Sequence, residues 1–96
     1  RVKIRDIRAG MRGITVEGVV KSKSKVWRLN TRYGPARFAF CIIEDDTGEI
    51  RLNLFRWQVD AVEVGRRIRV ENAFVKEFRG RLELNVGADG KIRVLK

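Results

Sequence analysis

The chain has 96 residues and a formal charge of +10 at pH 7, from 22 Lys and Arg against 12 Asp and Glu. It contains no histidine and a single cysteine, Cys41, which excludes a Cys/His zinc site and any Ser-His-Asp or Cys-His catalytic pair built from this chain. The basic surplus favours a polyanionic partner, although a high content of Arg, Lys and Glu is also typical of the solvated surface of a thermophilic protein.

Length and composition predict one domain over residues 1–96, because a chain of this size buries about 60% of its unfolded surface and folds without disulfides. Cys41 is therefore expected to be a small buried hydrophobe. No apolar run approaches the roughly 18 residues of a membrane helix, and the chain opens on charged residues. We expect a soluble cytoplasmic protein associated with the nucleoid. The initial Arg1 in place of Met leads us to expect that segments of a longer parent protein are missing.

The N-terminal segment, residues 1–12, is predicted to be a lead-in with one helical turn that plugs the end of a barrel, since Ile4 and Ile7 have helical spacing. From residue 14 onward, apolar residues alternate with polar ones, which predicts a long strand over residues 14–28. Gly18 inside it suits a sharp bend.

A basic stretch begins within this strand. No acidic residue lies between Lys21 and Phe40. Lys21, Lys23 and Lys25 alternate with serines, so an extended chain presents three ammonium groups on one side. The pattern predicts a track for phosphates.

The next elements are predicted to be a turn over residues 30–35 and a strand over residues 37–43 rich in aromatic and β-branched residues. Both faces of this strand are apolar, with Phe38 and Phe40 on one and Ala39 and Cys41 on the other. The sequence leaves open which face meets the core.

An acidic turn over residues 45–48 precedes the clearest strand of the chain, residues 49–55. Its composition is typical of a hairpin turn, and we prefer that interpretation to a metal site. In the strand, Ile50, Leu52 and Leu54 share one face. Phe55 is then an aromatic ring on a face otherwise occupied by polar groups.

A helix is predicted over residues 58–64, followed by a strand over residues 67–79. In that strand the apolar alternation changes parity at Asn72, which predicts a β-bulge there. The bulge turns Phe74, Lys76 and Phe78 away from the interior. Two short strands follow, residues 81–86 and 91–95, with a turn over residues 87–90 between them.

Together these elements predict an all-β fold, a five-stranded OB-fold barrel with a short helix between its third and fourth strands. A β-sandwich is the main rival, but it does not predict a helix in that one connection. In the OB-fold the middle strands form a nucleic-acid-binding face, so rings on an outer face favour stacking on bases.

Three segments carry motifs that occur together in one family: Asp-Asp-Thr-Gly-Glu-Ile-Arg-Leu-Asn-Leu-Phe over residues 45–55, Gly-Arg-Arg-Ile-Arg-Val-Glu-Asn-Ala-Phe over residues 65–74, and Phe-Arg-Gly-Arg-Leu-Glu-Leu-Asn-Val-Gly over residues 78–87. With them the chain resembles archaeal single-stranded DNA-binding proteins that have a simple OB-fold. These proteins are akin to replication protein A subunits and to the short human single-stranded DNA-binding proteins. The turn motif is shared with many OB-folds, whereas Glu-Asn-Ala-aromatic followed by Phe-x-Gly is far more specific.

The resemblance implies that Phe55, Phe74 and Phe78 stack on bases, and it places further contacts near Arg28. Trp27 departs from the family pattern, and the sequence leaves open whether it stacks on a base or covers the base of a loop. The residues predicted to bind nucleic acid are, for stacking, Phe55, Phe74, Phe78 and Trp27, and for phosphate and polar contacts, Lys25, Arg28, Arg37, Arg51, Asn53, Lys76 and Arg79.

The predicted function is sequence-independent binding of single-stranded DNA, which protects unpaired strands in replication, repair and recombination. We expect no enzymatic activity, no cofactor, no metal and no membrane partner. RNA is a second candidate ligand, partner proteins are expected to bind through segments outside this chain, and a monomer is favoured. Two alternatives remain: an RNA-binding or tRNA anticodon-binding OB domain of a larger protein, and an OB subunit used for protein-protein assembly.

Overall fold

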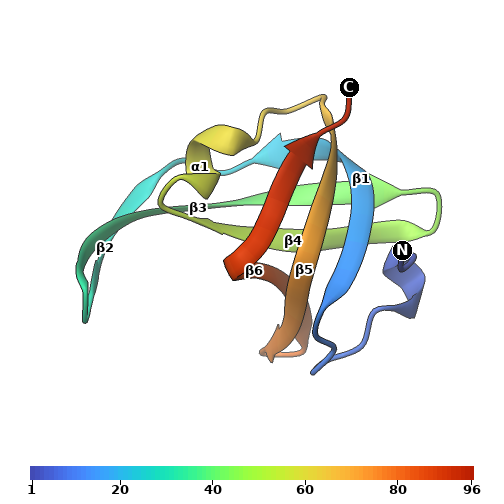
Figure 1. Ribbon diagram of the computed structural model, residues 1–96, viewed down its shortest axis with the longest axis horizontal. Coiled ribbons are helices and arrows are strands. Elements are labelled where there is room, and N and C mark those ends of the chain that lie inside the picture. The colour runs from blue at the N-terminus through green and yellow to red at the C-terminus, as the bar shows by residue number, and fades with distance from the viewer.

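A computed structural model describes residues 1–96, and Figure 1 shows its strands curling into a barrel. The elements, in chain order, are the 3-10 helix η1 (Ile4–Asp6), β1 (Ile14–Lys23), β2 (Trp27–Thr31), β3 (Gly34–Asp45), β4 (Gly48–Phe55), α1 (Gln58–Ala61), β5 (Arg67–Phe78) and β6 (Arg81–Val94). The strands follow the order β1-β5-β6-β4-β3-β2, and an additional pairing of β1 with β3 closes the barrel.

The barrel of five strands with a helix before β5 confirms the predicted OB-fold, and β2 is an extra strand outside the closed ring. In Figure 1 the β2–β3 hairpin bends away from the barrel at the left. The one parallel contact joins β4 to β6, where Arg51 pairs with Glu83 and Leu52 with Leu84. β6 therefore lies between β4 and β5, so the outer faces of these three strands form one surface.

Gly18 occupies the point where β1 passes from β5 to β3. It pairs with Ile68 of β5, and the next residue, Val19, also pairs with Glu44 of β3. A Cβ atom on Gly18 would lie 2.8 Å from the carbonyl oxygen of Glu44. Closure of the barrel at this point requires glycine.

Alternating residues of the strands fill the barrel with a cluster of 18 buried apolar side chains. The cluster includes Leu52 and Leu54, as the alternation in β4 predicted. In β3 the inner face is that of Ala39 and Cys41, both 0% exposed, so Phe38 and Phe40 lie on the outer face. Burial raises the pKa of the Cys41 thiol to about 12. The predicted burial of Cys41 is confirmed.

The predicted bulge at Asn72 is also confirmed. Asn72 has a φ of 55°, and the pairing of β5 with β6 shifts register between Glu71 and Ala73. Val70 is buried before the bulge and Ala73 after it, so the inner face changes parity across Asn72. Residues 87–90 lie opposite the bulge within a continuous β6, which corrects the prediction of a separate turn and strand there. β6 has more residues than β5 at this point, and the ladder absorbs them as an irregularity. The strand therefore continues through residues 87–90.

Two other predicted boundaries were wrong. The first strand ends at Lys23, because Ser24 leaves the ladder and bonds Phe40 through both its backbone N–H and its hydroxyl oxygen. The predicted helix over residues 58–64 stops at Ala61. There the ammonium group of Lys23 donates hydrogen bonds to the carbonyl oxygens of Val59 and Val62.

The predicted turn over residues 30–35 is shorter than expected. Thr31 pairs with Gly34, which leaves only two residues at the tip of the β2–β3 hairpin. The hydroxyl of Thr31 accepts from the backbone N–H of Tyr33 and donates to the carbonyl of Gly34, which stabilises the tight turn.

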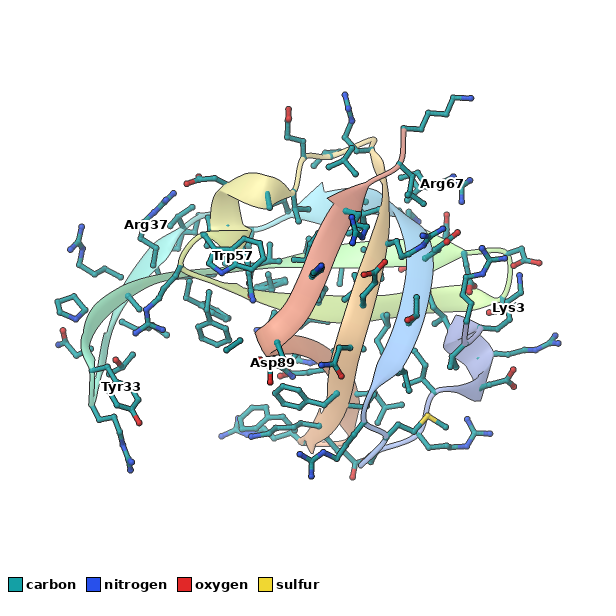
Figure 2. All side chains as sticks on the ribbon, viewed as in Figure 1. Lys3, Tyr33, Arg37, Trp57, Arg67 and Asp89 are labelled. Carbon is teal, nitrogen blue, oxygen red and sulfur yellow. The ribbon has the colours of Figure 1, made fainter.

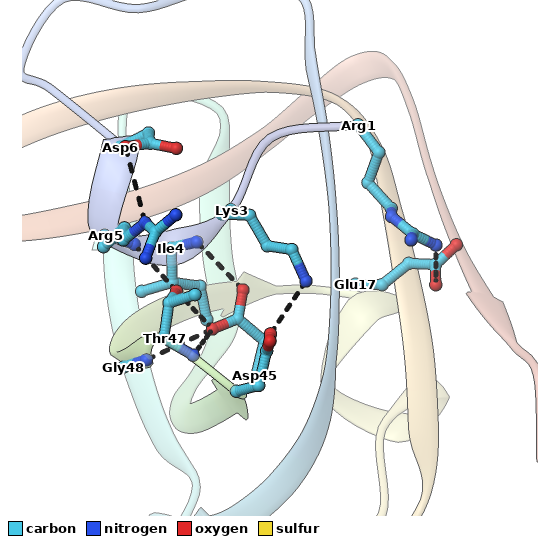
Figure 3. Close-up of polar contacts among 10 residues, drawn as sticks. Arg1, Lys3, Ile4, Arg5, Asp6, Glu17, Asp45, Thr47 and Gly48 are labelled. Carbon is cyan, nitrogen blue, oxygen red and sulfur yellow. Dashed lines mark hydrogen bonds and ion pairs between the residues drawn. The ribbon is translucent and has the colours of Figure 1, made fainter.

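The acidic turn between β3 and β4 fixes the N-terminal segment, as Figure 3 shows. The carboxylate of Asp45 accepts hydrogen bonds from the backbone N–H groups of Ile4, Thr47 and Gly48 and from the Thr47 hydroxyl. Burial acts to raise the pKa of Asp45, but these hydrogen bonds hold it below its usual range. The prediction of a hairpin turn is consistent with this geometry, and η1 plugs the barrel with Ile4 and Ile7.

Neither helix of the chain has the length and apolar character needed to cross a membrane.

Candidate nucleic-acid interface

One outer face of the barrel gathers aromatic rings from β2, β3 and β4. Strand pairing places Trp27 opposite Phe38, and Phe38 opposite Phe55. The ring centroids of Phe38 and Phe55 are 5.0 Å apart, and the Trp27 ring lies 6.0 Å from Phe38 and 6.2 Å from Phe40. These four residues form one packed cluster that extends from the barrel onto the hairpin.

Two further rings continue this face on β5. Phe74 pairs with Asn85 and Phe78 with Arg81 on β6, and β6 adjoins β4. Phe78 is 53% exposed, whereas Phe74 is half-buried and lies over Gly87. We call the whole surface the ring face, and it is made by Trp27, Phe38, Phe40, Phe55, Phe74 and Phe78.

The ring face contains the four residues predicted to stack and two that the sequence did not identify. Phe38 and Phe40 were missed because both faces of β3 are apolar, and only strand pairing shows which face is inside. The signal in the sequence was that both faces of this strand are apolar, so one of them had to lie outside the core.

A buried polar network occupies the middle of the ring face, on β4 and β6. Asn53 donates from Nδ2 to Glu83 Oε1 at 2.9 Å and to Asn85 Oδ1 at 3.2 Å. The guanidinium of Arg81 donates to Glu83 Oε2 at 2.7 and 3.0 Å, and Arg51 Nε donates to Asn53 Oδ1 at 2.9 Å. Asn53, predicted to contact nucleic acid, is 7% exposed and is used in this network.

Arg51 belongs to the same network and lies over the ring of Phe40. Its guanidinium carbon lies 3.8 Å from the centroid of Phe40, and its side chain is 17% exposed. Burial lowers the pKa of Arg51, and Glu83 partly offsets this effect. Arg51 is therefore engaged in contacts within the protein, unlike the cations that have no ion-pair partner.

Exposed cations without ion-pair partners lie beside the outer rings instead. Lys25 Nζ is 5.1 Å from the Trp27 ring, Lys76 Nζ is 5.9 Å from the Phe74 ring, and the Arg79 guanidinium is 5.2 Å from the Phe78 ring. All three cations are exposed, and none forms an ion pair. Each outer ring thus has a free positive charge within reach of a phosphate attached to a stacked base.

The structure places two other predicted residues elsewhere. Arg28 and Arg37 pair with each other across the β2–β3 hairpin at a position between those of Trp27 and Leu29, so they point to the opposite side from Trp27. Arg37 donates to both carboxylate oxygens of Asp60 on α1, at 2.7 and 3.1 Å. Figure 2 shows Arg37 on the upper side of the hairpin and Tyr33 at its tip. The ring face does not include these two arginines.

The opposite end of β5 presents ion pairs in place of rings. Arg69 Nε lies 2.7 Å from Glu17 of β1, and Arg93 Nε of β6 lies 3.0 Å from Glu71. Much of the positive charge at this end is neutralised within the protein.

Glu83 is expected to make the stability of the fold depend on pH. Burial acts to raise the pKa of Glu83, but hydrogen bonds from Asn53 and Arg81 and the charge of Arg51 hold it below its ordinary value of 4.5. The ionised form therefore stabilises the folded state above about pH 4.5, and this contribution is lost as pH falls through the lowered pKa. Glu83→Gln should remove that part of the acid sensitivity.

Urea unfolding at several pH values between about 3 and 7 measures the effect, because the midpoint reports the free energy of unfolding. The difference between the native protein and Glu83→Gln should grow as pH rises and then level off. Glu77→Gln, an exposed carboxyl on β5, serves as the control. A difference that is the same at every pH would contradict this role for Glu83.

Comparison with known proteins places the fold among nucleic-acid-binding domains. The family model described as OB-fold nucleic acid binding domain matches residues 14–92. The single-stranded DNA binding protein of Saccharolobus solfataricus is 27% identical over 90 residues, which cover 94% of this chain and 61% of that protein. The chain thus spans less than two thirds of the length of this curated relative.

Solved structures of two archaeal proteins have the same fold. The OB domain of a Thermoplasma acidophilum protein superposes with a TM-score of 0.85 at 28% identity, covering 99% of this chain and 86% of that one. The replication factor A related protein of Methanobacterium thermoautotrophicum gives a TM-score of 0.84 at 27% identity, covering 99% and 90%. The likeness extends over the strands that carry the ring face.

Proposed function

Because the chain belongs to the family of OB-fold nucleic acid binding domains, we propose that it binds single-stranded DNA on the ring face. The observation that carries the proposal is the ring face, which has a packed cluster from Trp27 to Phe55, two further rings on β5, and free cations beside its outer rings. The function stated in the name of the Saccharolobus relative supports the choice of ligand.

Bases are held by stacking on the rings. A base stacked on an aromatic side chain contributes about 1–3 kcal/mol and is tolerated whatever its identity, since every base has a π-face. Trp27, Phe55, Phe74 and Phe78 are the stacking residues of the proposal. Duplex DNA hides these base faces, so the same surface favours an unpaired strand.

Phosphates are held at the edges of the face by Lys25, Lys76 and Arg79. The centre of the face is unsuited to a phosphate, because Glu83 places a carboxylate there and Arg51 and Arg81 are already bonded within the network. This distribution of charge turns the bases toward the protein and the backbone toward solvent. No covalent step is involved, and the protein would protect unpaired strands in replication, repair and recombination.

A titration with labelled oligonucleotides tests the proposal. The expected order of affinity is oligo-dT first and duplex DNA last, with one protein chain sufficient because a single chain builds the whole ring face. Oligo-rU is the comparison that separates DNA from RNA preference. Equal affinity for duplex and dT would overturn the proposal, since it would indicate binding by charge alone.

Loss of a phosphate contact should change the salt dependence of binding. Neutralising one phosphate of a single strand adds about −0.7 to the slope of log affinity against log salt. Lys76→Ala and Arg79→Ala should therefore each make the slope less steep by about 0.7.

Arg67→Ala provides the matched control, because Arg67 is an exposed cation at the far end of β5, and Figure 2 shows it at the top of the molecule. Its slope should equal that of the native protein. If Arg67→Ala changed the slope as much as Lys76→Ala, the phosphate path would not follow the ring face.

A further inference from the structure

A depression of about 210 Å³ opens beside Phe74, at the end of the ring face. Its lining residues include Phe74, Arg12, Asn72, Asp89 and Gly87. Gly87 lies beside the ring, and a Cβ atom there would be 3.7 Å from Phe74 Cε1, an ordinary contact. The depression is smaller than the roughly 300–1,000 Å³ pockets that hold drug-sized ligands, and its size suits a single heterocycle.

The bulge at Asn72 brings together two polar residues that line the depression, Asn72 of β5 and Asp89 of β6. Asn72 donates from Nδ2 to the backbone carbonyl of Asp89 at 3.4 Å, which ties the bulge of β5 to the irregular part of β6. Gly90 allows this close approach, because a Cβ atom there would lie 2.9 Å from the Glu71 carbonyl oxygen. Figure 2 shows Asp89 at the bend of β6.

A free arginine lines two depressions that Phe74 also lines. Arg12 lines this depression and a second one of about 330 Å³ that adjoins Phe74 and Lys76. Arg12 is exposed and has no carboxylate partner within ion-pair distance. A phosphate attached to a base beside Phe74 therefore has a cation available on the N-terminal side, in addition to Lys76.

Asp89 and Asn72 supply hydrogen-bond acceptors to the depression, whereas Arg12 supplies its positive charge. The Asp89 carboxylate only accepts hydrogen bonds, and Asn72, which donates one of its two amide N–H groups to the Asp89 carbonyl, also offers Oδ1 as an acceptor. A carboxylate matches bases with exocyclic amino groups, as it does for cytosine N4. Guanine offers two adjacent donors, N1–H and the N2 amino group, whereas thymine offers one donor between two carbonyl oxygens that a carboxylate repels.

We propose that this depression is a pocket for one nucleotide, whose base carries an exocyclic amino group, with guanine preferred and thymine least favoured. The inference rests on the proposed function and adds to it. Stacking on the ring face does not depend on the base sequence of the DNA. At one position of the bound strand, however, Asp89 and Asn72 recognise the base by hydrogen bonds. Arg12 holds the phosphate of that nucleotide.

The test scans a single dG along a short dT oligonucleotide. The shortest dT that binds with full affinity is found first, because a longer strand could slide and place dG in the pocket from several positions. A dG at one position should tighten binding by about five-fold or more, and dG at the others should have little effect. Asp89→Asn should abolish the gain and leave the affinity for all-dT unchanged or slightly tighter.

Glu77→Gln is the matched control, since it removes one exposed carboxylate from β5 outside the depression. The dG gain should persist in this variant. The inference is overturned if no position gives a gain, if all positions give the same gain, or if the gain survives in Asp89→Asn. Failure of all-dT itself to bind would overturn the proposed function instead, and with it the pocket.

Discussion

Replacing Phe74 and Phe78 together by alanine is expected to weaken binding of oligo-dT by about 30-fold to 25,000-fold, because each ring supports a base stack of about 1–3 kcal/mol. Both rings lie on β5 beyond the bulge, with Phe78 53% exposed, so the loss should fall mainly on binding. Fluorescence anisotropy at fixed salt measures the effect. The salt slope should stay close to that of the native protein, since no cation is removed.

Trp57→Ala is the control for loss of aromatic surface. Trp57 is 56% exposed and precedes α1, and it makes no ring contact with the members of the ring face. Its replacement should leave the affinity for dT unchanged. Circular dichroism and thermal unfolding should show that the double variant is folded. A folded double variant that binds dT as the native protein does would disprove stacking on β5, whatever the basic residues contribute.

Gly18→Ala is expected to lower the free energy of unfolding by about 2–3 kcal/mol, the upper part of the range typical of overpacking. The added methyl group would meet the backbone of Glu44 at 2.8 Å, and backbone cannot move aside as a flexible side chain can. β1 would have to separate from β3 at the point where the barrel closes. For a domain of this size the midpoint of thermal unfolding should fall by about 10–20 °C.

Gly48→Ala is the matched substitution. A Cβ atom on Gly48 would meet only Ile4 Cγ2 at 3.7 Å, an ordinary contact, and the residue does not have a positive φ. Its unfolding temperature should change little. If the two variants were equally stable, the close approach of β1 to β3 would not be a constraint on the fold.

Local patterns were sufficient to predict much of the fold. Alternation in β4 and the change of parity at Asn72 depend only on neighbouring residues, because side chains of a strand alternate between two faces. The same argument placed Phe55, Phe74 and Phe78 on an outer face. The break between β1 and β2 could not be predicted this way, since it depends on hydrogen bonds between Ser24 and Phe40 across the sheet.

Which residues lie on or beside the ring face was harder to predict, because it depends on strand pairing. Glu83 and Asn53 share a network only because β4 and β6 run parallel at that point, and no sequence spacing indicates such a contact. Arg37 was predicted from the basic stretch, but its side of the hairpin is decided by the alternation that starts at β2. The charge of the sequence favoured a polyanionic ligand, but it did not indicate which basic residues lie beside the ring face.

The bulge at Asn72 sets the phase of β5. Before it, the outward residues are charged and form ion pairs with β1 and β6; after it, the outward residues are those of the ring face. One strand therefore contributes to two different surfaces. The single residue Asn72 reverses which alternate side chains of β5 point outward. Lengthening or shortening β5 by one residue at this point would exchange inside and outside for the whole second half, so core and interface can only be altered there together.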